Sequence, residues 1–247
     1  MKRIGIIGAM EKEVAYLKQE MRDVIVTRKA GLEFYEGSLV NKPVVVVRSG
    51  IGKVNAGICT QMMIDLYDLE GIINTGVAGS LCNDVNIGDI VVSTDTVQHD
   101  VDVTVFDYLS GQIPGMNVLA FEADSSLVEN AYASSQKVNR HIRTFKGRIV
   151  SGDQFISNQR RKEQLVKDFN ALCTEMEGAA IGQVAYLNQM PYVVVRAISD
   201  KADESAIVDS QTFSNEAIEN SVSLVKEMLR MNKEPRMEPI RFDFTMG

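Results

Sequence analysis

The chain has 247 residues and a formal net charge of −7, with 45% hydrophobic and 24% charged residues. This composition is ordinary for a soluble globular protein and is long enough for one large α/β domain with a substantial core. The acidic balance argues against a general nucleic-acid binder, which would usually present a basic face. No apolar run reaches about 18 residues, so we expect no membrane association through a spanning helix.

Apolar runs and helical patterns alternate along the first half of the chain. The sequence predicts strands over 4–8, 33–40, 43–47, 71–74 and 89–93, and helices over 11–21, 52–66 and 125–138. In the second half it predicts strands over 147–151, 173–176 and 192–198, and helices over 158–169, 179–187 and 214–231. This alternation indicates a largely parallel sheet covered by helices. A hairpin over 33–47 favours a mixed sheet, and the segment 232–247 is expected to be an irregular extension.

The cysteines and histidines give no metal or disulfide pattern. Cys59, Cys82 and Cys173 are far apart and form no CxxC motif, and the only histidines are His99 and His141. A disulfide framework and a zinc site are therefore not expected, and a reducing cytoplasm is the expected location. The short apolar run near the N-terminus ends at charged residues, which does not fit a secretory leader.

Functional groups follow several predicted strands, where ligands collect in open α/β sheets. Glu13 lies in the first turn of a helix, where an acid is catalytic or simply interacts with the helix dipole. The segment 48–53 is an incomplete dinucleotide fingerprint, because Asn55 occupies the third glycine position. Its helix start either binds a polar ligand through backbone N–H groups or is a tight turn.

Three further strand ends leave similar alternatives. The small residues of 74–80 allow a ligand to approach the backbone or form a plain turn. Phe155 either stacks on a planar base or belongs to the core. Arg196, Ser199 and Asp200 follow a buried strand, where charged side chains are paired or functional. The stretch "TEMEG" carries Glu175 and Glu177, which would point the same way on an extended strand.

Taken together, these segments resemble the nucleoside phosphorylase/nucleosidase superfamily and, within it, the bacterial 5′-methylthioadenosine/S-adenosylhomocysteine nucleosidases. The matching segments run in order from Arg3 to about Asp203: "IGIIGAMEKEV", "SGIGKVNA", "IINTGVAG", "GDIVVS", "HDVDVTVF", "GQIPG", "IVSGDQFI", "EMEGAAI" and "PYVVVRAISDKAD". The resemblance implies a single α/β domain over 1–231, built on a central twisted mixed sheet flanked by helices, and a homodimer. It implies hydrolysis of an N-glycosidic bond of an adenine nucleoside, in methionine salvage and recycling of S-adenosylmethionine by-products, without metal or cofactor.

The resemblance also implies a role for each matching residue. Glu13 would activate the attacking water, Asp200 would protonate adenine N7, and Glu177 would bind the ribose hydroxyls. Met176 would lie under the ribose, and this requires the chain to turn near Gly178 so that it and Glu177 face one sugar. Glu175 would then be an indirect partner.

Other matching residues would bind the nucleoside. Arg196 would lie near the water and Ser199 would orient the aspartate, while Phe155 would stack on adenine and the Ile156 backbone would read its Watson–Crick edge. Further matching residues would line the pocket for the 5′-substituent: Met10 and Ile51 from the same subunit, and Val103, Phe106 and Pro114 from the partner subunit.

Two positions depart from the family pattern. Val77 stands where a small hydroxyl residue is frequent near the water, so only a backbone contact is expected there. In the segment 207–213, Ser210 replaces the first residue of an aromatic pair and Phe213 is kept. The preference among methylthioadenosine, adenosylhomocysteine and 6-amino-6-deoxyfutalosine is therefore left open. A phosphate-dependent phosphorylase and a non-catalytic nucleotide sensor are the alternatives outside nucleosidase chemistry.

Overall fold

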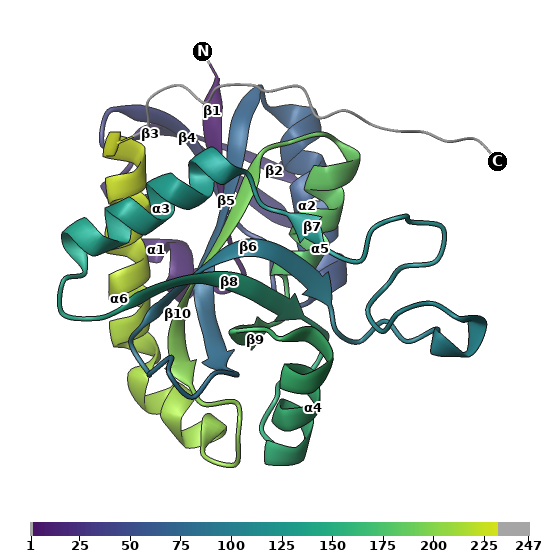
Figure 1. The fold of residues 1–247 in the computed structure, drawn as a ribbon. Helices are drawn as coiled ribbons and strands as arrows, with labels where there is room; N and C mark the ends of the chain where they lie inside the picture. Colours follow the sequence, from purple (N-terminus) through teal and green to yellow (C-terminus); the bar gives the residue numbers. More distant parts are fainter. Residues whose placement is uncertain (1, 232–247) are drawn as a thin grey trace.

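The computed structural model describes residues 2–231 and contains a ten-stranded mixed sheet in the order β10-β6-β8-β9-β5-β1-β4-β3-β2, with β7 beside β6 (Figure 1). The strands are β1 (Arg3–Gly8), β2 (Arg22–Lys29), β3 (Leu32–Leu39), β4 (Lys42–Arg48), β5 (Leu69–Ser80), β6 (Ile90–Gln98), β7 (Phe121–Glu122), β8 (Thr144–Ser151), β9 (Cys173–Glu175) and β10 (Tyr192–Asp200). The helices are α1 (Glu11–Glu20), α2 (Lys53–Leu66), η1 (Thr104–Phe106), α3 (Ser125–Val138), α4 (Gln159–Phe169), α5 (Gly178–Leu187) and α6 (Ala206–Met231).

Strand β5 closes part of this sheet into a ring. It pairs antiparallel with β9 and parallel with β10, while β10 also pairs with β6. The ring therefore contains β10, β6, β8, β9 and β5. The remaining strands continue the sheet from β5 without closing, in the order β1, β4, β3 and β2. The predicted mixed α/β sheet is confirmed, with parallel pairing at its centre and the antiparallel β2-β3-β4 meander at its edge.

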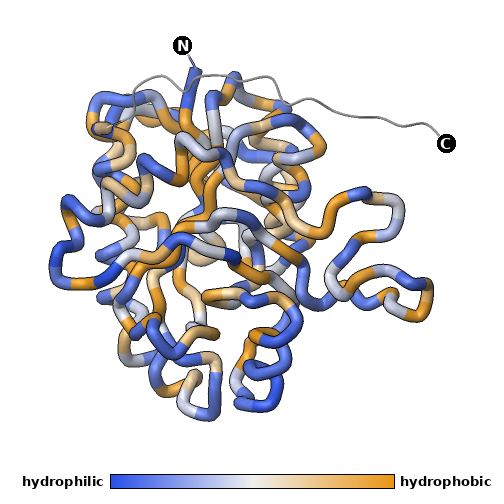
Figure 2. Tube along the Cα trace, in the orientation of Figure 1, coloured by the Kyte–Doolittle hydropathy of each residue, from blue (hydrophilic) through white to orange (hydrophobic). Residues whose placement is uncertain are grey.

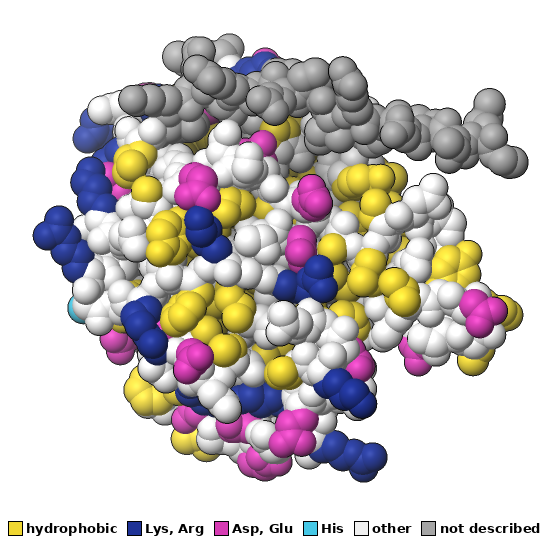
Figure 3. Space-filling model, viewed as in Figure 1, with side chains coloured by type: hydrophobic (Ala, Val, Ile, Leu, Met, Phe, Trp, Pro, Cys, Tyr) yellow, Lys and Arg dark blue, Asp and Glu magenta, His cyan; other side chains and the backbone are white. Residues whose placement is uncertain are grey.

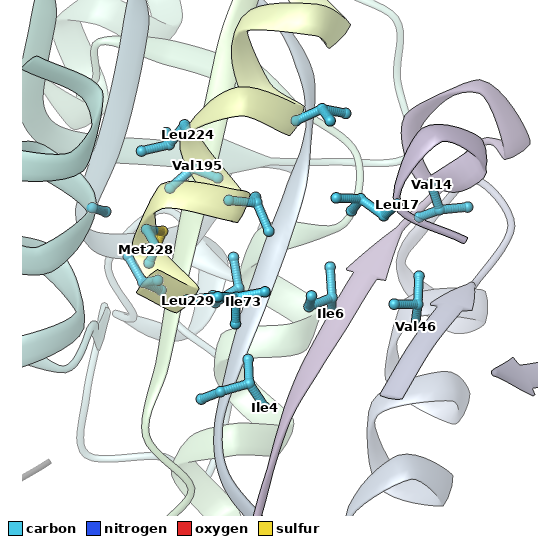
Figure 4. Close-up of a cluster of buried hydrophobic side chains, with 14 of the residues drawn as sticks. Ile4, Ile6, Val14, Leu17, Val46, Ile73, Val195, Leu224, Met228 and Leu229 are labelled. Carbon is cyan, nitrogen blue, oxygen red and sulfur yellow. The ribbon is translucent and has the colours of Figure 1, made fainter. Parts of the chain in front are cut away.

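Helices cover both faces of the central strands. Alternate residues along each strand point to opposite faces of the sheet, and each face forms a separate hydrophobic core with its helices. Ile6 and Val46 face α1 and α6, whereas the neighbouring Ile7 and Val47 face α2 and α5. Figure 4 shows the first of these cores, and Figure 2 shows hydrophobic residues along the central strands. Each fully buried aliphatic side chain contributes about 1.5–3 kcal/mol of burial free energy, so this two-sided covering fixes the strand ends that carry the site.

Three elements were not predicted from the sequence, and the predicted bounds of two others were wrong. Strand β2 was not predicted because most of its residues are exposed, and β7 and η1 were too short to give a pattern. Strand β5 continues through the small residues of 74–80, because they pair with the end of β10 instead of forming a turn. Helix α6 begins at Ala206, eight residues before the predicted start, so the segment 207–213 is helical.

Two predictions meet the limits of the described range. The expected extension, 232–247, lies outside the described residues. Among residues 2–231, no helix combines the length and the apolar character needed to cross a membrane.

Candidate active site

Glu13 is a buried acid in the first turn of α1, held by three backbone donors. Its Oε2 accepts hydrogen bonds from the N–H groups of Ala9 (2.7 Å) and Met10 (2.8 Å), and its Oε1 accepts one from Val77 of β5 (3.2 Å). Burial raises the pKa of Glu13, although the Arg196 charge and these hydrogen bonds oppose the change. The carboxylate is therefore part of the helix cap and also reaches across to β5, which the dipole interpretation alone does not require.

Arg196 is a fully buried cation on β10 that is shared among several acceptors. Its Nη2 donates to Asn74 Oδ1 (2.6 Å) and to Glu175, and its Nε donates to Glu175 Oε2 at 3.2 Å. The same Nη2 lies 3.7 Å from Glu177 Oε2. A buried guanidinium needs this kind of compensation. The structure thus brings Arg196 and both acids of "TEMEG" into one buried cluster.

The predicted turn after this stretch is present. Strand β9 ends at Glu175, α5 begins at Gly178, and Glu177 between them has left the extended conformation (φ −134°, ψ −40°). The Glu175 carboxylate accepts hydrogen bonds from the N–H groups of Glu177 (3.1 Å) and Gly178 (2.8 Å), and it thereby caps the start of α5. It also accepts from the Ser151 hydroxyl. The carboxylate oxygens of Glu175 are therefore occupied by donors of the protein itself.

Glu177 is the second acid of the stretch and points toward the loop after β4. Its Oε1 accepts from the Gly52 N–H at 2.9 Å. Burial, together with repulsion from Glu175, raises the pKa of Glu177 to about 7, against the lowering influence of Arg196. Sequence reasoning left two alternatives for this helix start, a bound polar ligand or a tight turn. In the structure its N–H groups donate to carboxylates of the protein itself, Gly52 to Glu177 and Lys53 to Asp153.

Asp200 is buried at the end of β10 with each oxygen occupied by one donor. The Ala202 N–H donates to Oδ1 and the Ser199 hydroxyl donates to Oδ2, both at 2.9 Å. Burial raises the pKa of Asp200 despite these hydrogen bonds. A Cβ on Gly79 would lie 2.6 Å from Asp200 Oδ1, so the facing position of β5 must be a glycine.

The proposed substrate-contacting side chains differ widely in exposure. Phe155 is 52% exposed and is not a core residue, which removes one of its two interpretations. The Ile156 side chain is buried and packs with Val150 and Leu165, so it does not face a ligand. Ile51 is also 52% exposed, and three others are half-buried: Met10, Val77 and Met176.

The three residues assigned to the partner subunit lie on the chain between β6 and β7, which projects from the body (Figure 1). Phe106 is 72% exposed, Pro114 is exposed, and Val103 is half-buried. Hydrophobic side chains are visible on this projecting segment in Figure 3, and Val105 and Leu109 are among the exposed ones. The structure therefore exposes Phe106 and Pro114 on this projecting segment, while Val103 is half-buried.

Ser210 and Phe213 lie in the first turns of α6 and are half-buried. The Ser210 carbonyl accepts a hydrogen bond from the Ser214 hydroxyl within the same helix. Sequence reasoning placed Asn74 and Ser151 at strand ends of interest but gave neither a role; in the structure they hold Arg196 and Glu175. The one sequence signal for the role of Asn74 was a polar side chain inside the buried run 71–74, because a buried amide needs hydrogen-bond partners.

Comparison with known proteins identifies the family of this chain. A family model described as "Phosphorylase superfamily" matches residues 3–230. The 5′-methylthioadenosine/S-adenosylhomocysteine nucleosidase of Bacillus pumilus is 41% identical over 94% of this chain and 100% of that protein. The structure of the Neisseria meningitidis nucleosidase with methylthio-immucillin-A has a TM-score of 0.89 and 37% identity, covering 93% of this chain and 99% of that one. A Helicobacter pylori futalosine hydrolase mutant has a TM-score of 0.88 and 36% identity, with coverage of 93% and 99%. The chain belongs to the phosphorylase superfamily and, within it, to the 5′-methylthioadenosine/S-adenosylhomocysteine nucleosidases.

Proposed function

We propose that this protein hydrolyses the N-glycosidic bond of 5′-methylthioadenosine and S-adenosylhomocysteine, releasing adenine and the 5-thioribose sugar. The observation that carries the proposal is the set of three buried carboxylates, Glu13, Glu177 and Asp200, each fixed by different donors. The names of the relatives supply the substrate class. Hydrolysis at an anomeric carbon needs a proton on the leaving group and negative charge near the sugar, and carboxyl groups provide both.

Asp200 is proposed as the acid that protonates adenine N7. An ordinary Asp with a pKa near 3.9 is ionised at neutral pH and has no proton to give. Burial raises the pKa of Asp200, which favours the protonated form or a proton shared with N7. The Ser199 hydroxyl and the Ala202 N–H fix the orientation of the carboxyl group.

Glu13 is proposed as the base that positions the attacking water and takes its proton. A raised pKa makes the carboxylate a stronger base, and its three backbone donors hold it in place. The Val77 N–H bond to Oε1 supports the expectation that a backbone contact remains although the hydroxyl side chain is absent. Arg196 adds positive charge beside this carboxylate.

Glu177 is proposed to bind the ribose hydroxyls, with Met176 beneath the sugar ring. The Gly52 N–H donates to Oε1, and Arg196 lies 3.7 Å from Oε2. The carboxylate is therefore held in place while Oε2 keeps the capacity to accept hydrogen bonds from the ribose. A negative group next to the sugar stabilises the oxocarbenium-like transition state. The turn between Glu175 and Gly178 supports this assignment, because it lets residues 176 and 177 leave the strand alternation.

The remaining assignments concern binding. The exposed Phe155 ring would stack on adenine while the Ile156 backbone reads its Watson–Crick edge. Met10 and Ile51 would line the pocket for the 5′-substituent. In a homodimer, Val103, Phe106 and Pro114 of one subunit would complete that pocket in the other, and the exposure of Phe106 supports such a contact.

Two competing functions make different demands on the site. A phosphorylase needs cationic groups free to bind phosphate, but Arg196 is held by Asn74 and Glu175, and Arg48 is exposed on the surface. A preference for 6-amino-6-deoxyfutalosine is the second candidate, because the Helicobacter pylori futalosine hydrolase mutant is almost as similar as the nucleosidases. Serine at position 210 also alters the helix that would lie over the 5′-substituent.

The testing experiment is adenine release from methylthioadenosine, adenosylhomocysteine and 6-amino-6-deoxyfutalosine, each in phosphate-free buffer. Release from the first two at higher kcat/KM supports the proposal. A higher kcat/KM for aminodeoxyfutalosine would assign the protein to the second candidate. In the organism the products would enter methionine salvage and the recycling of S-adenosylmethionine by-products.

A further inference from the structure

Lys53 is an unexpected residue at the beginning of α2. It occupies the first helical position, where a cation faces the positive end of the helix dipole. The first turn of α2 contains no acid, and the preceding residue, Gly52, has no side chain with which to cap the helix. A lysine at this point costs helix stability unless other groups compensate its charge.

The compensation comes from two aspartates that are remote in the sequence. Lys53 Nζ lies 2.5 Å from Asp100 Oδ1, and the Lys53 N–H donates to Asp153 Oδ1 at 2.8 Å. The Asp153 N–H in turn donates to Asp100 Oδ2 at 2.9 Å. Lys53, Asp100 and Asp153 thus form a closed cluster, hereafter the Lys53 cluster, in which each residue binds the other two.

The ion pair between Lys53 and Asp100 in the Lys53 cluster is partly shielded from solvent, whereas Asp153 is exposed. The side chains of Lys53 and Asp100 are 17% and 16% exposed, unlike the typical surface ion pair. Burial tends to raise the pKa of Asp100, but the hydrogen bonds from Lys53 and the Asp153 N–H outweigh it and lower the pKa. Asp100 therefore stays ionised in the neutral range.

Each member of the Lys53 cluster belongs to a different segment of the proposed nucleoside site. Lys53 follows Gly52, whose N–H binds Glu177. Asp153 lies two residues before Phe155, and Asp100 lies three residues before Val103. The Lys53 Nζ also donates to Gln98 Oε1 at 2.9 Å, which extends the contact into the end of β6.

We infer that Lys53, Asp100 and Asp153 are positioning residues that fasten the ribose-binding, base-stacking and partner-facing loops of this site to one another. The inference rests on the proposed function for its kinetic consequence, and the fastening itself rests on geometry alone. The cluster shares no hydrogen bond with Glu13 or with Asp200, whose described donors lie on other segments. Its loss should therefore weaken nucleoside binding more than proton transfer.

The test compares Lys53→Met and Asp100→Asn with a matched control, Lys146→Met. Lys146, near the start of β8, pairs with Glu129 of α3 at 2.7 Å, and the Glu129 side chain is 66% exposed. Two readouts are taken on the full chain: amide hydrogen exchange of the free protein, and KM and kcat for methylthioadenosine. Lys53→Arg serves as the conservative variant that retains the charge.

We expect faster exchange in 49–53, 99–104 and 151–156 for both cluster variants and no change there for the control. KM should rise about tenfold, the effect of losing one charge-assisted hydrogen bond, while kcat changes less than about threefold. The variant with both Lys53→Met and Asp100→Asn should have a KM no higher than the higher of the two single variants, because both substitutions remove the same ion pair. Lys53→Arg, which keeps the positive charge, should have a KM close to that of the wild type.

Two results would overturn the inference: unchanged exchange and KM in the cluster variants, or an equal KM rise in Lys146→Met. A wild-type protein that releases adenine from no nucleoside would contradict the proposed function instead. The exchange measurement would still decide whether the Lys53 cluster fastens the three loops.

Discussion

The Glu13 carboxylate and the Arg196 guanidinium meet over one glycine of β5. A Cβ on Gly76 would lie 2.6 Å from Glu13 Oε1 and 2.9 Å from Arg196 Nη1, which is closer than atoms pack. The absence of a side chain at this position lets the base proposed to activate water and the buried cation approach each other. Gly76 therefore belongs to the site although it contributes no functional group.

Replacing Gly76 with alanine should displace Glu13 or Arg196. We expect kcat to fall about a hundredfold, since small misplacements of catalytic groups have effects of this size. Gly57→Ala on α2 is the matched control, because its Cβ would meet nothing closer than 3.9 Å. Steady-state kinetics of both variants, with thermal unfolding as a check on folding, gives the answer; a fully active Gly76→Ala enzyme would show that the close contact has no catalytic importance.

Asp200→Asn should remove the acid proposed to protonate adenine. We expect kcat to fall by about 10³, within the range for loss of a general acid. Asp203→Asn, three residues later on a less buried site, should retain nearly full activity. Adenine release measured for both variants tests this, and near-normal rates for Asp200→Asn would refute the role given to that residue.

Glu177 makes the stability of the protein depend on pH. Its pKa is raised from 4.5 to about 7 in the folded state, so the folded protein binds this proton more tightly than the unfolded chain. The resulting stabilisation is complete below about pH 4.5 and is lost as the pH rises through about 7.

Glu177→Gln should therefore raise the free energy of unfolding at pH 8 by on the order of 2 kcal/mol relative to wild type, and change it little at pH 5. Thermal unfolding at the two pH values measures the difference. Glu129→Gln, at a 66% exposed side chain on α3, is the surface control. A Glu177→Gln variant that is equally destabilised at both pH values would contradict the raised pKa.

Ser210→Phe should change which 5′-substituent the enzyme prefers. An aromatic ring on the first turns of α6 would add apolar surface, which favours the small methylthio group over a polar tail. We expect the ratio of KM values for adenosylhomocysteine and methylthioadenosine to change about fivefold, the scale of one altered apolar contact. Thr212→Phe, on an exposed position of the same helix, is the control; an unchanged ratio in Ser210→Phe would show that this helix does not select the substrate.

The fold could be predicted where strands are buried on both faces. The apolar runs at 4–8, 43–47 and 192–198 each correspond to a central strand. Strand β2 could not be found because it lies at the sheet edge, where exposure removes the hydrophobic pattern. The early start of α6 was missed because its first turns mix exposed apolar and polar residues, including Ile207 and Val208.

The site could be predicted only in part, for a similar reason. Carboxylates at strand ends stood out in the sequence, and the resemblance ranked them. The support around them depends on contacts between distant segments, such as Asn74 with Arg196 and Asp100 with Lys53. Spacing along the chain contains no information about such contacts until the strand order is known.

The most direct test of the account is adenine release from methylthioadenosine with and without phosphate, followed together with the sugar product. Hydrolysis by water predicts release of adenine and free 5-methylthioribose in phosphate-free buffer, at a rate that added phosphate does not change. A strict requirement for phosphate, with formation of the sugar 1-phosphate, would contradict it.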